Sequence, residues 1–90
     1  MRFEWDPEKA AENLAKHGVS FEEAATVFRD ALSATGSDPD HSVDEERFIT
    51  FGLSTAGRLL VVAHTDRDDT IRIISARPVT PREREIYEEG

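Results

Sequence analysis

The stretch from Arg47 to Arg77 contains three short runs of β-branched, aromatic and aliphatic residues. The runs are Phe48 to Leu53, Leu59 to Val62 and Ile71 to Ile74, and they are separated by the turn-forming segments Ser54 to Gly57 and Asp66 to Asp69. Runs of this length and composition, divided by such turns, are typical of a three-stranded antiparallel meander with two hairpins. We therefore expect the chain to fold around a small antiparallel sheet.

The two faces of this sheet follow from the strand pairing, because side chains alternate between faces along a strand. We take Thr55 to Gly57 as a three-residue loop in which Gly57 adopts a positive φ. One face then holds only apolar residues, namely Ile49, Phe51, Leu53, Leu59, Val61 and Ala63. The other face is mixed and holds Phe48, Thr50, Gly52, Ser54, Arg58, Leu60, Val62 and His64. We expect helices to cover the apolar face and form the core there.

The second turn is expected to bring two arginines together on the mixed face. An even-length turn puts Ile71, Ile73, Ser75 and Arg77 on that face, and a four-residue turn sets Arg77 directly opposite Arg58. Like charges directly opposite each other destabilise a sheet, so this pair needs nearby carboxylates or a bound anion. The arginine pair is the first indication of function in the sequence.

Two helices are predicted before the meander, after a short edge strand over Arg2 to Trp5. Asp6, a good N-cap followed by proline, begins the first helix, and Gly18 ends it. The apolar stripe of this helix consists of Ala10, Ala11, Leu14 and Ala15. A capping box over Ser20 to Glu23 begins the second helix, which extends to about Arg29. We expect the two helices to pack as a hairpin on the apolar face.

The segment from Asp30 to Glu46 is rich in Asp, Ser, Gly and Pro and predicts a loop, with a short strand near Leu32 to Thr35. Within it, Asp38-Pro39-Asp40-His41 matches no standard metal-ligand spacing, so we expect a solvated turn and no metal site. After the meander, a capping box over Thr80 to Glu83 begins a short terminal helix that extends to about Glu89. Together the elements predict an α+β fold: the meander over 47–77 with the N-terminal strand, two N-terminal helices on one face, and a C-terminal helix.

The composition narrows the class of protein. The chain has 90 residues, no cysteine and a net charge of −8. We expect one domain over residues 1–90, in the reducing cytoplasm, with no membrane-spanning segment and no signal peptide. Overall acidity argues against tight non-specific binding of nucleic acid. A local group of arginines can still bind phosphates, because the guanidinium fork matches their geometry.

Several short motifs follow one another along nearly the whole chain. They are Phe3-Glu4-Trp5-Asp6, Lys16-His17-Gly18-Val19-Ser20-Phe21-Glu22-Glu23-Ala24, His41-Ser42, Glu45-Glu46-Arg47, Gly57-Arg58, Arg72-Ile73-Ile74-Ser75-Ala76-Arg77, and Glu83-Arg84 followed by Tyr87-Glu88. Each motif is weak alone, but in this order they are specific, and the chain resembles the BrnT family of bacterial type II toxins. The resemblance implies a fold similar to RelE-type ribonuclease toxins, with helices packed on a small antiparallel sheet.

The resemblance also implies a function and a partner. It implies an RNA-cleaving toxin that halts translation and that needs no cofactor. It further implies an antitoxin of the BrnA type, a ribbon-helix-helix DNA-binding protein that neutralises the toxin. The complex of the two would repress its own promoter, so promoter DNA would be bound only through the antitoxin.

Metal-independent cleavage of RNA uses the 2′-hydroxyl as nucleophile, and it needs a base, an acid and cations near the phosphorus. We expect Arg58 and Arg77 to bind the phosphate, with Arg47 as a further RNA-binding residue. His64 and Tyr87 are the candidates for proton transfer, since imidazole changes charge near neutral pH. The predicted catalytic set is therefore Arg58, Arg77, His64 and Tyr87, with no metal.

Each of these residues also has a purely structural interpretation. The two arginines could form salt bridges to carboxylates of the terminal helix, namely Glu83, Glu85 or Glu88. His64 could be a partly buried sheet residue, and Tyr87 could pack against the sheet with its hydroxyl in water. His17 suits helix capping, and Arg72 suits an ion pair with an acid of the first two helices.

Three functions remain open at this point. The first is a ribonuclease toxin that uses the arginine face. The second is a catalytically weak or inactive binding module that acts through antitoxin pairing and promoter autoregulation. The third is an inactive domain that binds a small anion. Arginines open to solvent favour the first function, and arginines tied to the terminal helix favour the second.

Overall fold

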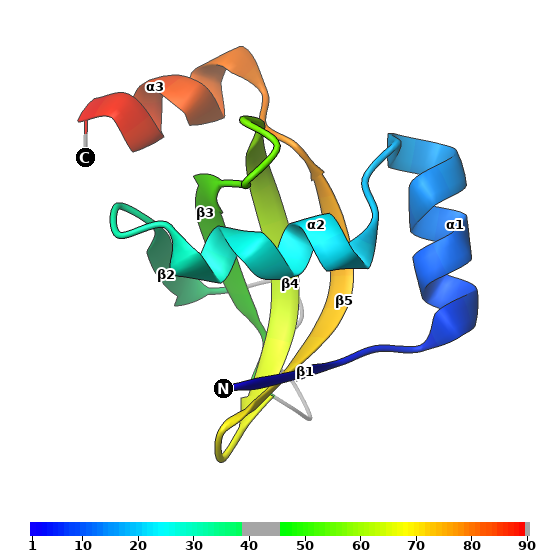
Figure 1. The fold of residues 1–90 in the computed structure, drawn as a ribbon. Coiled ribbons are helices and arrows are strands. Elements are labelled where there is room, and N and C mark those ends of the chain that lie inside the picture. The colour runs from blue at the N-terminus through cyan, green and yellow to red at the C-terminus, as the bar shows by residue number, and fades with distance from the viewer. Residues whose placement is uncertain (39–45, 90) are drawn as a thin grey trace.

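The computed structural model describes residues 1–38 and 46–89. Within these ranges it has the predicted α+β fold, with five strands in one sheet (Figure 1). The elements are β1 (Arg2–Glu4), α1 (Pro7–His17), α2 (Phe21–Thr26), the 3₁₀ turn η1 (Val27–Arg29), β2 (Ala34–Ser37), β3 (Phe48–Leu53), β4 (Leu59–Arg67), β5 (Thr70–Pro78) and α3 (Pro81–Glu89). The strand order is β1-β5-β4-β3-β2, with β1 parallel to β5 and all other neighbours antiparallel.

The segments around the meander follow the predictions with small shifts. β1 is an edge strand as expected, and β2 begins two residues later than the strand predicted near Leu32. Residues 39–45 lie outside the described ranges, and with them most of the predicted turn at Asp38 to His41 and the His41-Ser42 motif. No helix in the described part of the chain is long and apolar enough to cross a membrane.

The first hairpin has the predicted register. Phe51 pairs with Val61 and Leu53 pairs with Leu59, so the alternation along β3 and β4 is as expected. Gly57 has a φ of 81° and closes the loop with a hydrogen bond from its N–H to the carbonyl of Ser54 at 2.9 Å. A left-handed φ of this kind is accessible to glycine without steric cost, which explains the loop position.

The second hairpin differs from the prediction in a way that moves Arg77. Its turn has two residues rather than four, with Arg67 paired to Thr70, and β5 then contains a bulge at Ile74. Ala63 pairs with Ser75 while His64 pairs with Ile73, so Ile74 is an extra residue on β5. One extra residue inverts the alternation for everything that follows it. Ser75 and Arg77 therefore lie on the opposite face from Arg58, and the expected juxtaposition of the two arginines is wrong.

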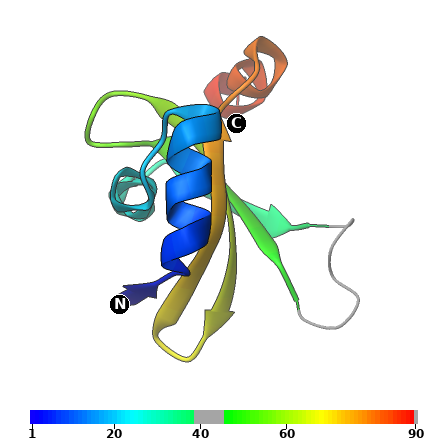
Figure 2. The ribbon, with the colours of Figure 1, turned by 90° about the vertical axis from the view of Figure 1, so that its right-hand side faces the viewer.

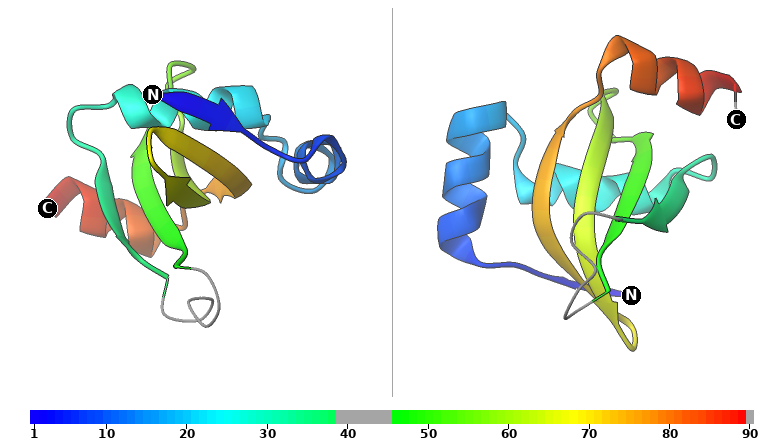
Figure 3. Two further views of the ribbon diagram at one scale, coloured as in Figure 1. Left: turned by 90° about the horizontal axis from the view of Figure 1, so that it is seen from below. Right: turned by 180° about the vertical axis from the view of Figure 1, so that it is seen from behind.

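The prediction of which face forms the core is also wrong, although the register is right. We call the side with Thr50, Gly52, Ser54, Leu60, Val62 and His64 the helix face, and the side with Ile49, Phe51, Leu53, Leu59, Val61 and Ala63 the outer face. The core consists of Val19, Phe21, Ala24, Val27, Leu60, Val62, Ile71, Ile73 and Ala76. Thr50 and Ser54 on the helix face are buried. On the outer face Leu59 and Val61 are buried as predicted, but they do not belong to the core cluster, and Leu53 is 46% exposed. Seen from below, α2 and α3 lie on opposite sides of the sheet (Figure 3).

The small residues of the helix face explain this reversal. A Cβ atom on Gly52 would lie 2.6 Å from Cγ1 of Val27, so the missing side chain is what lets η1 approach the sheet. The polar residues beside it have partners, because Thr50 bonds to His64 and Ser54 bonds to Glu23. Buried polar groups that are hydrogen-bonded carry little penalty. A mixed face can therefore be the better packing surface for a helix.

The first helix lies beside β5 rather than over the sheet (Figure 2). β1 pairs only with residues Thr70 to Arg72 of β5. Further along this edge of β5, the side chain of Asn13 takes the place of a neighbouring strand by binding the backbone groups of Ala76. Its Nδ2 donates to the carbonyls of Ala76 (2.8 Å) and Val19 (2.9 Å), and its Oδ1 accepts from the N–H of Ala76 (3.1 Å). Of the predicted apolar stripe, Ala10 packs against the core, but Leu14 is 53% exposed and the buried residue of α1 is Asn13.

The helix ends form as the sequence indicates. Asp6 caps α1 by accepting from the N–H of Glu8 at 2.9 Å, and Gly18 ends the helix with a φ of 68°. Ser20 caps α2 by accepting from the N–H of Glu23 at 3.0 Å. At α3 both halves of the capping box are present. The N–H of Thr80 donates to Glu83 (2.8 Å), and the N–H of Glu83 donates to Thr80 Oγ1 (3.2 Å).

Candidate functional site

Arg58 lies on the helix face, where it joins the start of β4 to the first turn of α2. Its Nε donates to Oε2 of Glu23 at 2.9 Å, and its Nη2 donates to Oε1 of Glu23 at 2.5 Å and to the carbonyl of Gly18 at 2.9 Å. Oε2 of Glu23 also accepts from the hydroxyl of Ser54 at 2.7 Å. The hydrogen bonds from Arg58, more than any other influence, lower the pKa of Glu23. The structural interpretation of Arg58 as an ion-paired residue holds, but its partner is on α2 and not on the terminal helix.

Arg77 lies on the outer face and is bound by the terminal helix. Its Nη1 and Nη2 donate to the two carboxylate oxygens of Glu83 at 2.8 and 2.9 Å, and Nη1 also donates to the carbonyl of Pro78 at 3.2 Å. This bidentate contact lowers the pKa of Glu83 to about 2, and it raises the pKa of Arg77. Fork-to-carboxylate pairs of this kind are among the stronger hydrogen-bonded contacts in proteins. The side chain of Arg77 remains 40% exposed.

His64 is buried on the helix face and belongs to a chain of short hydrogen bonds. Its Nδ1 contacts Oδ1 of Asp66 at 2.6 Å, its Nε2 contacts the hydroxyl of Thr50 at 2.7 Å, and that hydroxyl contacts Oγ1 of Thr35 at 2.7 Å. The imidazole packs edge-on against Phe28, with ring centroids 4.9 Å apart. The network connects β4 to β3 and to the edge strand β2. A substrate has no direct access to His64 in this arrangement, because the residue is only 1% exposed.

Tyr87 attaches the terminal helix to the loop that follows η1. Its hydroxyl donates to Oδ2 of Asp30 at 2.6 Å, whereas the sequence suggested a hydroxyl in water. Asp30 also accepts from the N–H groups of Leu53 (2.8 Å) and Leu32 (3.0 Å). These contacts, led by Tyr87, lower the pKa of Asp30, and the carboxylate raises the pKa of Tyr87.

Two further arginines were singled out in the sequence. Arg72 pairs with Glu4 of β1 at 2.8 Å, so its expected ion pair exists but with a strand residue instead of an acid of the helices. Arg47 is half-buried just before β3, and its carbonyl accepts from the N–H of Asp38 at 2.8 Å.

His17 is the last residue of α1 and is half-buried at that helix end.

The predicted site residues are therefore not brought to one place. Arg58 and His64 share the helix face, and Arg77 is on the outer face. Tyr87 lies on α3 and contacts Asp30, which follows η1. Sequence reasoning missed Asn13 and Asp30, whose side chains bind backbone groups far away in the sequence. A polar residue in an otherwise apolar helix position is the one signal that could have indicated Asn13. In the described part of the chain, no group of three or more His, Cys, Asp or Glu residues is placed to hold a metal ion.

Comparisons with known proteins identify the family. A model of the family described as "Ribonuclease toxin, BrnT, of type II toxin-antitoxin system" matches residues 5–83. The chain is also similar in structure to the Brucella abortus ribonuclease toxin BrnT, with a TM-score of 0.64 and 20% sequence identity over 89% of this chain and 97% of that one. None of the curated proteins matches the chain. The structural likeness confirms the fold, for which RelE-like is a looser description. Because the family model matches most of its length, the chain belongs to the BrnT family of ribonuclease toxins of type II toxin–antitoxin systems.

Proposed function

We propose that this chain inhibits translation in the cytoplasm by cleaving RNA without a metal ion, and that Arg77 binds the scissile phosphate. The observation that carries the proposal is the family match over residues 5–83, which includes α1, strands β2 to β5 and the first turn of α3. Arg77 lies within this range, at the end of β5 beside that turn. Tyr87 lies beyond it, so the family match gives no support to a role for Tyr87.

The geometry of Arg77 suits this role. A guanidinium has five N–H donors, and the contacts with Glu83 and Pro78 use three of them. Nε and one hydrogen of Nη2 remain, and together they can donate to two oxygens of a phosphodiester. Glu83 holds the fork in place before the substrate arrives, which lowers the cost of organising it in the transition state.

The other predicted residues have a weaker case as members of the same site. Arg58 keeps both hydrogens of Nη1 available, but it faces the other side of the sheet and would meet a different phosphate. We assign Arg58 and Arg47 to contacts with flanking RNA. His64 and Tyr87 remain the proposed proton-transfer residues only if α3 and β2 move, because one is buried and the other donates to Asp30.

A second candidate function has an observation in its favour. Arg58 and Arg77 are both ion-paired with glutamates, and Arg77 is tied to the terminal helix. That is the arrangement expected of a binding module that acts through its antitoxin and not through catalysis. The two functions predict different outcomes when the chain is expressed alone.

The experiment is induced expression of the wild type beside Arg77→Ala, with growth and RNA integrity followed over time. Arg72→Ala is the matched control, because Arg72 is also on β5, is also paired with a glutamate at 2.8 Å and is similarly exposed. We expect RNA loss and growth arrest with the wild type and with Arg72→Ala, and neither with Arg77→Ala. Intact RNA and normal growth with the wild type would favour the binding module instead.

We further propose that the partner is a ribbon-helix-helix antitoxin and that the complex represses its own promoter. The net charge of −8 supports a partner with a basic contact surface, since complementary charge steers association. The test is co-purification of the tagged chain with the product of the adjacent gene. Failure of the two proteins to associate at micromolar concentration would remove this partner.

A further inference from the structure

A shallow cleft of about 260 Å³ lies where α1 meets the outer side of β5. It is lined by Lys9, Glu12, Asn13, Lys16 and His17 of α1 and by Ile74 and Ser75 of β5. Counted from Lys9, the other helix residues follow at three and four and then at seven and eight positions, so they share one face of α1 over two turns. The β5 residues are the bulge residue and its neighbour.

The charge of this cleft sets it apart from two others that the structure contains. A cleft at the far end of the β4–β5 hairpin holds Arg67 and Arg72 together with Glu4 and Asp66, and Arg72 is already paired with Glu4. Another at the hairpin tip holds three aspartates and no cationic side chain. The cleft along α1 has two lysines and a histidine against a single carboxylate. On a chain with a net charge of −8, it is the one of the three that attracts an anion.

Three of the polar side chains of the cleft, those of Lys9, Lys16 and Ser75, are available to a ligand. In residues 1–38 and 46–89, neither Lys9 nor Lys16 forms an ion pair, and the hydroxyl of Ser75 forms no hydrogen bond. By contrast, Arg58 next to β4 and Arg72 and Arg77 on β5 all bind carboxylates. The lysines are therefore free point charges, each with three donors.

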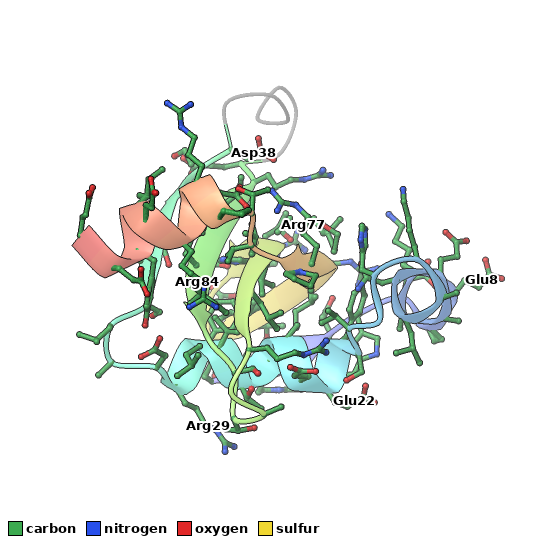
Figure 4. All side chains as sticks on the ribbon, turned by 90° about the horizontal axis from the view of Figure 1, so that it is seen from above. Glu8, Glu22, Arg29, Asp38, Arg77 and Arg84 are labelled. Atoms are coloured by element: carbon green, nitrogen blue, oxygen red, sulfur yellow. The ribbon has the colours of Figure 1, made fainter. Side chains whose placement is uncertain are left out.

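The cleft is held in a fixed position relative to Arg77. Asn13 binds both backbone groups of Ala76, which fixes this face of α1 next to Ser75. Ser75 and Arg77 lie on the same face of β5, two positions and so about 7 Å apart along the strand. In the view from above, Arg77 is seen between α3 and α1 (Figure 4). A chain of phosphates lying in the cleft thus continues toward the guanidinium.

We propose that this cleft binds the backbone of single-stranded RNA, with Lys9 and Lys16 contacting phosphates on one side of the scissile phosphate held by Arg77. The inference rests on the proposed function for its substrate, and it adds the path that the RNA takes across the protein. The bulge at Ile74 is essential to it, because the bulge is what turns Ser75 and Arg77 to the outer side. Backbone contacts of this kind position a substrate without reading its sequence.

The test measures binding of a short single-stranded 2′-O-methyl RNA, which lacks the free nucleophile and so stays intact, by fluorescence anisotropy over a series of salt concentrations. The slope of log affinity against log salt is negative, and we expect Lys9→Gln/Lys16→Gln to reduce its magnitude by about 1.4, or about 0.7 for each lost phosphate contact. The matched control is Arg2→Gln/Arg29→Gln, which removes the same charge from exposed positions away from the cleft and should reduce the magnitude by much less. Glutamine keeps helix propensity, and circular dichroism verifies the fold of each variant.

A change of the opposite sign provides a second measurement. Glu12→Gln removes the one carboxylate of the cleft and should tighten RNA binding by roughly two- to fivefold. Glu22→Gln makes the same change on the exposed side of α2 and should leave the affinity nearly unaltered (Figure 4).

The outcomes separate this inference from the proposed function. If the wild type cleaves RNA and Lys9→Gln/Lys16→Gln has an unchanged KM and an unchanged salt slope, the cleft is not an RNA-binding site. The proposed ribonuclease function is unaffected by that result. A wild type that neither cleaves nor binds RNA overturns both. A raised KM with a nearly unchanged kcat in the double lysine variant supports the cleft as a binding site.

Discussion

The carboxylate of Glu83 accepts two hydrogen bonds from the guanidinium of Arg77 and a third from the backbone N–H of Thr80, at 2.8, 2.9 and 2.8 Å. One side chain thus closes the cap of α3 and orients the arginine at the end of β5. The terminal helix and the proposed phosphate-binding residue are coupled through this contact, and its strength depends on the ionisation of Glu83.

The first prediction concerns pH. Folding lowers the pKa of Glu83 from 4.5 to about 2, so the folded state binds fewer protons than the unfolded state between these values. The stability from this group is therefore fully present above about pH 4.5 and is lost as the pH falls toward 2. We expect wild type to exceed Glu83→Gln in unfolding free energy by about 1 kcal/mol at neutral pH, after allowance for solvent screening. Urea midpoints of both proteins should converge near pH 2, and a constant difference down to that pH would contradict the coupling.

The second prediction tests which sheet face forms the core. Leu60→Ala should cost about 2–5 kcal/mol, because Leu60 is fully buried under α2. The identical change at Leu53, 46% exposed on the outer face, should cost far less. Chemical denaturation of both variants provides the comparison. A larger loss at Leu53 would restore the assignment of faces expected from the sequence.

The third prediction concerns the close approach of η1 to β3. Gly52→Ala should destabilise the fold by about 1–3 kcal/mol, since the new Cβ would lie 2.6 Å from Val27 and 3.1 Å from Ser33. Gly36→Ala is the control, because a Cβ at that position meets nothing within 4 Å. Thermal unfolding of the two variants distinguishes the contacts, and equal melting temperatures would show that η1 can shift at no cost.

The fourth prediction concerns the attachment of the terminal helix. Tyr87→Phe removes the hydrogen bond to Asp30 and should cost about 1 kcal/mol. Amide hydrogen exchange in α3 should become faster, because this hydrogen bond attaches the helix to the loop after η1. Ile86→Ala serves as the control, because Ile86 is 58% exposed whereas Tyr87 is half-buried. Unchanged exchange in the phenylalanine variant would mean that Glu83 alone holds the helix.

The sequence by itself determined the elements and the register of the first hairpin. Local signals carried this information: Gly57 for the loop, Asp6 and Gly18 for the first helix, and Thr80 with Glu83 for the last. These signals work because caps and turns satisfy backbone groups a few residues away, and such contacts are readable from spacing alone. The family motifs were equally readable, since they follow the order of the chain.

The tertiary structure alone decided where the side chains of the site meet. The bulge at Ile74 shifts Arg77 to the outer face. The consecutive residues Ile73 and Ile74 interrupt the alternation of apolar and polar residues in β5, but this pattern alone does not distinguish a bulge from a strand that is buried on both faces. The choice of the core face depended on Gly52 accepting η1 and on partners for Thr50 and Ser54, all of them from other elements. Asn13 and Ala76, which form a hydrogen bond, are 63 positions apart in the sequence. The backbone groups at an open strand edge need hydrogen-bond partners. Only the packed chain shows which side chain is near enough to provide them.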